Sequence, residues 1–97
     1  MTLKLCRRRP EARIDGVKVA LNWKLWQLLG FLIDAKGEIV TNDELCDAFD
    51  LNLDHDACNG HILSIVYRAR RRLRKAGYPN VIETVGYQGY RLHQEMT

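Results

Sequence analysis

The sequence lacks the long apolar run that a membrane-spanning helix requires, since no stretch approaches about 20 consecutive apolar residues. It also lacks a positively charged start followed by an apolar stretch and a small-residue cleavage site, which argues against secretion. No repeat, low-complexity tract or linker rich in proline, glycine and serine divides the chain. We therefore expect one domain over residues 1–97, located in the cytoplasm.

Motifs for catalysis and for metal binding are missing as well. The sequence contains no Ser/His/Asp order, no phosphate-binding loop and no HExxH motif, and a chain of 97 residues leaves little room for a substrate pocket. His55, Cys58 and His61 follow one another at intervals of three, but a fourth ligand at a recognisable spacing and a Cys-x-x-Cys pair are absent. We expect neither an enzyme nor a bound metal or cofactor.

Cysteine is scarce. Cys6, Cys46 and Cys58 form an odd and widely spaced set, which does not predict a disulfide framework. We expect these residues to be free, partly buried thiols in a reducing compartment.

The charge is distributed unevenly although the net charge is only +3. Residues 1–33 contain seven basic and two acidic residues, residues 34–59 contain one basic and eight acidic residues, and residues 60–97 contain seven basic and two acidic residues. If the two basic ends meet on one face, that face will attract phosphate while the acidic middle points elsewhere.

Alternating apolar and polar residues predict strands near the start of the chain. The alternation runs over residues 11–21 and is interrupted by Asp15-Gly16, a dipeptide typical of a tight hairpin turn. Leu3 and Leu5 indicate a further short strand before this hairpin.

Two amphipathic helices are predicted next. The first begins after Asn22, which we expect to be its N-cap, and ends at Gly37. The second covers about residues 42–49 and begins with a capping box formed by Thr41 and Glu44.

A loop, a third helix and a hairpin complete the chain. Residues 50–56 contain three Asp and one Asn and predict a loop. The helix begins at about residue 57 or 60 and extends to 76, with its apolar residues at intervals of three and four. Residues 81–92 then predict a β-hairpin with a tip that contains glycine.

The predicted third helix has a strongly basic exposed face. His61, Ser64, Arg68, Arg71 and Lys75 recur at helical spacing opposite the apolar stripe, and six of the eight residues from 68 to 75 are basic. No acidic residue between positions 56 and 83 offsets these charges. A polyanion would relieve their mutual repulsion, and an α-helix fits the major groove of DNA, where arginine binds guanine.

Several segments resemble the OmpR/PhoB-type winged-helix effector domains. Residues 82–92, IETVGYQGYRL, are similar to the family's closing I-x-T-V-R-G-x-G-Y-R-L. Residues 68–73, RARRRL, resemble its R-L-R-K-x-L helix, and residues 37–45, GEIVTNDEL, resemble its G-x-V-V-S-R-E-E-L. The resemblance covers nearly the whole chain in the right order.

The resemblance implies an α+β fold and a function. The fold is a winged helix-turn-helix with a short N-terminal antiparallel sheet, three helices and a C-terminal hairpin. The function is sequence-specific binding of double-stranded DNA in transcription regulation, with helix 60–76 in the major groove and hairpin 81–92 as the wing. The family also suggests head-to-tail pairs on direct repeats and a contact of loop 50–56 with RNA polymerase. Most relatives carry a receiver domain, so this chain is either a short regulator or a fragment of a longer one.

The resemblance also assigns roles to single residues. Arg68 matches a base-contacting position of the recognition helix, and Arg70 matches a phosphate-contacting one. Gly86 stands where the family often has a wing arginine, so phosphate contacts are expected to move to other arginines of the helix. The candidate DNA-contacting residues are His61, Ser64, Tyr67, Arg68, Arg70, Arg71, Arg72, Arg74, Lys75, Thr84, Tyr87 and Tyr90.

Two alternatives stay open at this point. The altered wing also fits a winged helix that binds another protein and no longer contacts DNA, although the basic stripe argues against it. Tyr87 and Tyr90 are suited either to stacking on bases or to packing within the hairpin. We expect Trp23 and Trp26 to lie in the core.

Overall fold

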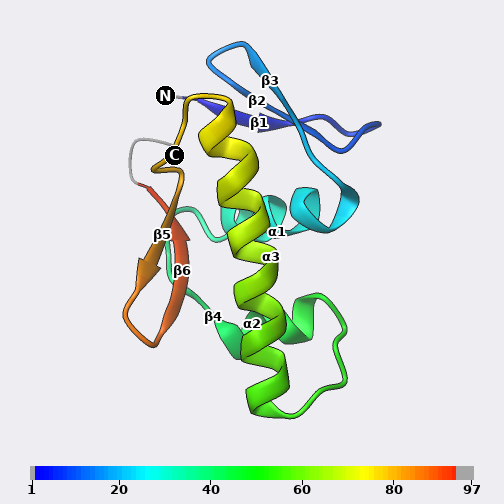
Figure 1. Ribbon diagram of the computed structural model, residues 1–97, viewed down its shortest axis with the longest axis vertical. Coiled ribbons are helices and arrows are strands. Elements are labelled where there is room, and N and C mark those ends of the chain that lie inside the picture. The colour runs from blue at the N-terminus through cyan, green and yellow to red at the C-terminus, as the bar shows by residue number, and fades with distance from the viewer. Residues whose placement is uncertain (1, 94–97) are drawn as a thin grey trace.

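The computed structural model describes residues 2–93, and their elements follow the predicted order (Figure 1). The sequence-based prediction of an α+β winged helix is confirmed. The elements are β1 (Leu3–Leu5), β2 (Glu11–Ile14), β3 (Val17–Ala20), α1 (Trp23–Asp34), β4 (Val40–Thr41), α2 (Asn42–Ala48), α3 (His55–Lys75), β5 (Ile82–Val85) and β6 (Gly89–Leu92).

The N-terminal sheet is antiparallel, with strand order β1-β2-β3. Its predicted hairpin turn is confirmed, because Asp15 and Gly16 both have positive φ, at 49° and 85°. Two consecutive residues of this kind form the turn whose twist matches that of the flanking strands. In the resulting register Ile14 pairs with Val17, and Ile14 is fully buried beneath the sheet.

Side-chain caps define the helix starts. Asn22 Oδ1 accepts a hydrogen bond of 2.9 Å from the backbone N–H of Leu25, and both hydrogen bonds of the predicted Thr41–Glu44 capping box are present. The third helix begins at His55, earlier than predicted, because Asp54 Oδ1 accepts from the first turn at 2.8 Å and caps it. The preceding loop is correspondingly shorter than the predicted 50–56.

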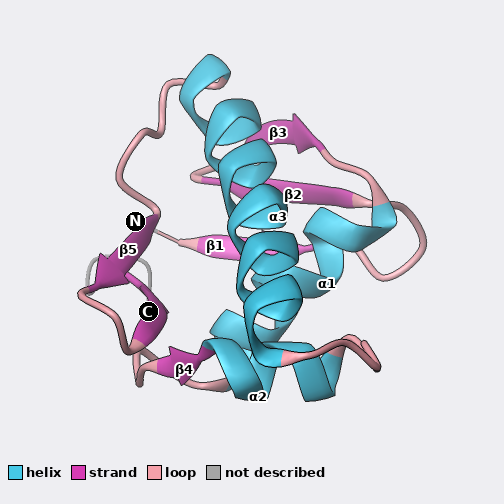
Figure 2. Ribbon diagram, turned by 60° about the horizontal axis from the view of Figure 1, so that its bottom comes forward, coloured by secondary structure: helices cyan, strands magenta, loops and turns pink. Residues whose placement is uncertain are grey.

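The core lies where the three helices meet the two sheets (Figure 2). Each helix contributes its apolar stripe, and α3 buries its stripe toward α1 and α2. The prediction that Trp23 belongs to this core is wrong, since Trp23 is 51% exposed and packs edge-on against Trp26. Trp26 is half-buried, and its indole Nε1 donates a hydrogen bond of 2.7 Å to the carbonyl of Cys6.

The C-terminal hairpin is part of a second sheet with strand order β4-β6-β5. Val40 of β4 pairs with Tyr90 of β6, so the hairpin is attached to the segment that precedes α2. Gly89 permits this pairing, because a Cβ atom at its position, with φ of +158°, would overlap the backbone of Val40. Among residues 2–93, no helix is both long and apolar enough to span a membrane.

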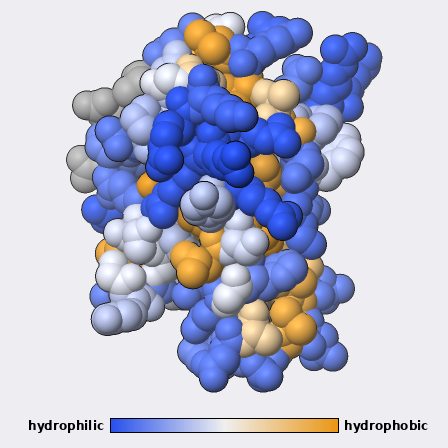
Figure 3. All heavy atoms as spheres, viewed as in Figure 1, coloured by the Kyte–Doolittle hydropathy of each residue, from blue (hydrophilic) through white to orange (hydrophobic). Residues whose placement is uncertain are grey.

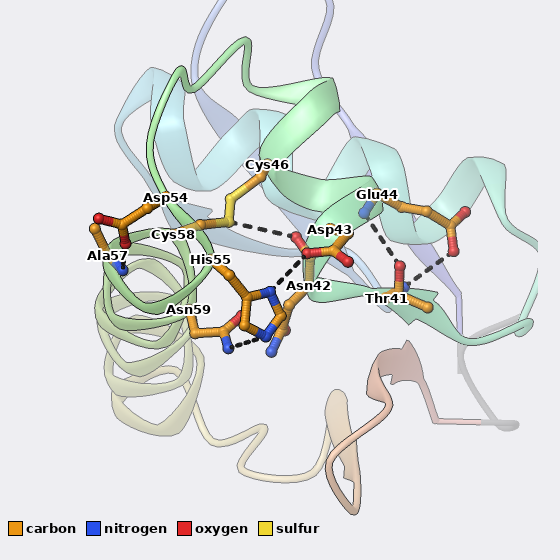
Figure 4. Close-up of polar contacts among 10 residues, drawn as sticks. All are labelled: Thr41, Asn42, Asp43, Glu44, Cys46, Asp54, His55, Ala57, Cys58 and Asn59. Carbon is orange, nitrogen blue, oxygen red and sulfur yellow. Dashed lines mark hydrogen bonds and ion pairs between the residues drawn. A yellow bond between two sulfur atoms is a disulfide. The ribbon is translucent and has the colours of Figure 1, made fainter.

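A disulfide joins Cys46 in α2 to Cys58 in the first turns of α3 (Figure 4). The expectation of three free thiols is therefore wrong for these two residues, and only Cys6 is a free cysteine among the described residues. The two Cα atoms lie 6.2 Å apart, and both side chains are buried. The loop between α2 and α3 is thus enclosed in a covalent ring.

Candidate nucleic-acid interface

The C-terminal half of α3 presents a cluster of cations to solvent. Arg68, Arg71, Arg74 and Lys75 are all exposed and make no hydrogen bond or ion pair with the part of the protein that the structure describes. Figure 3 shows this strongly hydrophilic cluster over the upper half of α3. Cations at this end of a helix are stabilised by the helix dipole, but they still repel one another. The arrangement is suited to a polyanionic ligand.

Arg70 points from the same helix toward the hairpin. One of its terminal nitrogens, Nη2, donates hydrogen bonds of 3.0 Å to the carbonyl of Ile82 and 2.6 Å to Oγ1 of Thr84. Its guanidinium also lies 5.9 Å from the centre of the Tyr90 ring, within cation–π range. Arg70 therefore connects the candidate recognition helix to the wing.

Arg72 points to the opposite side of α3 and connects it to the N-terminal sheet. Its Nη1 atom donates a hydrogen bond of 3.2 Å to the carbonyl of Ala20 at the end of β3. A hollow of about 280 Å³ lies beside this contact, between the start of α1 and the basic face of α3. It is lined by Asn22, Leu25, Arg68, Arg71, Arg72 and Lys75.

The N-terminal half of the exposed face is less charged. His61 and Ser64 are exposed there, as the helical spacing predicted. Leu63 and Tyr67 are exposed beside them, by 59% and 63%. Leu63 was not among the predicted contact residues, although its position outside the apolar stripe of the helix indicated its exposure.

The hairpin has an exposed tip and a buried base. Tyr87 at the tip is fully exposed, beside Gly86, which has a φ of +52°. Thr84 is exposed, whereas Tyr90 is only 5% exposed and packs within the fold. Burial raises the pKa of the Tyr90 hydroxyl above its ordinary value, and the charge of Arg70 opposes that shift.

A pair of opposite charges connects the two strands of the hairpin. Arg91 Nε donates a hydrogen bond of 2.8 Å to Oε2 of Glu83, directly across the ladder. This hydrogen bond, together with the charge of Arg91, holds the pKa of Glu83 below its ordinary value. His93 Nε2 lies 3.6 Å from the other carboxylate oxygen.

The acidic residues of segment 43–56 lie at the opposite end of α3 from the basic cluster. They belong to α2, to the loop that follows it and to the start of α3, at the bottom of Figure 1. Asp43 accepts a contact of 3.3 Å from His55, and Asp50 and Asp54 are exposed in the loop. In the described part of the chain, no group of three or more His, Cys, Asp or Glu residues is placed to hold a metal ion.

The sequence of this chain is similar to those of known transcriptional regulatory proteins. Residues 16–92 match the model of the family described as transcriptional regulatory protein, C terminal. The chain is 36% identical over 81 residues to YvcP of Bacillus subtilis strain 168, an uncharacterized transcriptional regulatory protein. The match covers 82% of this chain but only 33% of YvcP, so the chain spans about a third of that relative.

Solved structures share the fold. The DNA-binding domain of RstA from Klebsiella pneumoniae, in complex with the RstA box, superposes with a TM-score of 0.77 at 24% identity. That superposition covers 95% of this chain and 91% of the RstA domain. The DNA-binding domain of CadC from E. coli gives a TM-score of 0.76 at 23% identity, over 94% of this chain and 85% of the other.

Proposed function

Because the chain belongs to the family of C-terminal domains of transcriptional regulatory proteins, we propose that it regulates transcription by inserting α3 into the major groove of a specific DNA site. The observation that supports this most directly is the group of four exposed cations on α3. An α-helix fits the major groove, and cations on the same helix can neutralise the phosphates on either side. Residues 1–97 act in this proposal as a single DNA-binding unit.

The exposed residues of α3 divide into two kinds of contact. Arg68 is the base-contacting residue, since its guanidinium is exposed and arginine can donate two hydrogen bonds to guanine O6 and N7. Arg71, Arg74 and Lys75 bind phosphates. His61, Ser64 and Tyr67 contact the groove from the preceding turns.

The wing supplies a second contact with the DNA backbone. Thr84 and Tyr87 are exposed on the hairpin and are the residues of the wing that we assign to this contact, with Thr84 Oγ1 also accepting the hydrogen bond from Arg70. Arg70, Arg72 and Tyr90 contribute by orienting α3 against the wing and the N-terminal sheet, since their side chains are engaged within the protein. Gly86 provides no side chain for the minor groove.

Two further partners belong to the proposal. The RstA domain was solved on its DNA box, and head-to-tail pairs on direct repeats would suit a site of that kind. The exposed acidic loop, with Asp50 and Asp54, is repelled by DNA and is available to RNA polymerase. Changing both to Asn should reduce transcription in vitro without weakening DNA binding. Output that simply follows DNA occupancy would exclude a role for the loop in contacting polymerase.

Selection of preferred duplexes from a random pool, followed by binding measurements at several salt concentrations, tests the main proposal. We expect a preferred sequence, a steep salt dependence, and a loss of discrimination of about 1–3 kcal/mol at one or two base pairs in Arg68→Ala. An unchanged preference in Arg68→Ala would show that Arg68 does not contact bases. Absence of any preferred duplex would favour the alternative, a winged helix that binds protein.

A further inference from the structure

The exposed face of α3 changes character along its length. Its C-terminal half is cationic, whereas two large apolar side chains, Leu63 and Tyr67, project from consecutive turns in the middle of the helix. They line a hollow of about 430 Å³ together with Gly60, Ser64 and Arg70. In Figure 3 this change is visible as paler and orange atoms below the dark blue cluster.

The exposure of Leu63 follows from its position on the helix. The other large aliphatic residues of α3, such as Ile62 and Leu73, are buried in the stripe that faces α1 and α2, and Leu63 lies outside that stripe. Two small residues, Gly60 and Ser64, lie beside the exposed pair, and a Cβ atom placed on Gly60 would meet nothing within 4 Å. The surface around Leu63 and Tyr67 is therefore open to close approach by a ligand.

We propose that Leu63 and Tyr67 contact the C5-methyl groups of thymines in the major groove, which makes thymine a requirement at those base pairs. This inference rests on the proposed function, in which α3 enters the groove. The methyl group of thymine is the only apolar group that the four base pairs present there. Leu63 and Tyr67 offer the matching apolar surface on the helix.

The charges around the apolar pair favour DNA over a protein as its occupant. Arg70 borders the hollow, and Arg68 and Arg71 lie one turn beyond Ser64 and Tyr67, respectively. An apolar patch bordered by cations on its C-terminal side suits a ligand with apolar groups set beside phosphates. The acidic residues of the protein are concentrated in α2 and in the loop and first turn next to it.

Replacement of thymine by uracil tests the proposal, because it removes the methyl group and leaves the hydrogen-bonding groups unchanged. Each thymine of the selected duplex is changed to deoxyuridine, and dissociation constants are measured for the wild type, Leu63→Ala and Tyr67→Ala. We expect the wild type to bind about fourfold more weakly per contacted methyl group, the effect of exposing one methylene-sized group. Leu63→Ala or Tyr67→Ala should bind the thymine and uracil duplexes equally at the affected position.

Leu53→Ala is the matched control, since Leu53 is another exposed leucine, 48% exposed, in the loop before α3. It should retain the full difference between thymine and uracil. A wild type that binds its selected site but ignores uracil would overturn the inference and leave the proposed function intact. The inference is also overturned, with the proposed function intact, if Leu63→Ala and Tyr67→Ala keep the full difference in affinity between the thymine and uracil duplexes. This would be seen as affinities for both duplexes that fall by the same factor, or as affinities that do not change, as expected if the two residues bind a protein. Failure to select any duplex would overturn the proposed function itself.

Discussion

The salt dependence of DNA binding should distinguish the free cations of α3 from those engaged within the protein. Arg71, Arg74 and Lys75 are exposed and have no partner among residues 2–93. Each phosphate that they neutralise contributes about −0.9 to the slope of log K against log salt concentration. The three residues together therefore account for a slope of about −2.7.

Arg71→Gln is the sharpest single test of this reasoning. The variant should bind every duplex more weakly, and its slope should be smaller in magnitude by about 0.9. Between 50 and 200 mM salt, this difference corresponds to about a 3.5-fold change in the ratio of wild-type to variant affinity. Fluorescence anisotropy on a selected and a scrambled duplex, over that range of salt, would measure it.

Lys36→Gln is the control, because it removes one positive charge just as Arg71→Gln does. Lys36 is exposed in the turn after α1 and does not belong to α3. Its substitution should leave the slope unchanged, which separates a phosphate contact from a general effect of net charge. An unaltered slope in Arg71→Gln, or an equal change in both variants, would refute the assignment of Arg71 to a phosphate.

Three other predictions concern the supports of the interface. Arg70→Gln should lower the free energy of unfolding by about 1–2 kcal/mol through loss of its hydrogen bonds to the wing, measured by urea denaturation, while the salt slope changes little. Reduction of the Cys46–Cys58 disulfide, which closes a loop of sequence separation 12, should cost about 3 kcal/mol, and a variant with both cysteines changed to Ala should not respond to reductant. The lowered pKa of Glu83 stabilises the fold above the ordinary value of 4.5, and this contribution is lost as the pH falls through the lowered pKa. Glu83→Gln should therefore show a smaller loss of thermal stability on acidification than the wild type, and identical pH profiles would contradict this.

Local patterns predicted most of the secondary structure because the interactions that determine it are close in sequence. The Asp15-Gly16 turn and the Thr41–Glu44 capping box each depend on residues within four positions of one another. The predicted start of α3 was too late, and the reason is again an interaction between residues close in sequence. Asp54 lies in an acidic stretch that predicted a loop, but its carboxylate caps the helix.

Residues of the same type with adjacent numbers have different roles, and local pattern could not distinguish them. Arg70 and Arg71 are neighbours in one basic run, yet Arg70 bonds to the hairpin 12 and 14 residues away and Arg71 remains exposed. The difference depends on where the hairpin lies against α3, which is a property of the packed molecule. The exposure of Trp23 likewise depends on how the core closes around its neighbours.

The sequence by itself determined the order of elements, the apolar stripe of each helix and the concentration of cations on the last one, since these follow from spacing and composition. Only the tertiary structure decided which cations remain free, that β4 joins the hairpin, and that Cys46 and Cys58 meet. Their pairing requires α2 and α3 to pack with the two Cα atoms 6.2 Å apart. The physical reason is that contacts between elements depend on the angle and distance at which whole faces pack, and residue spacing within one element contains no information about either.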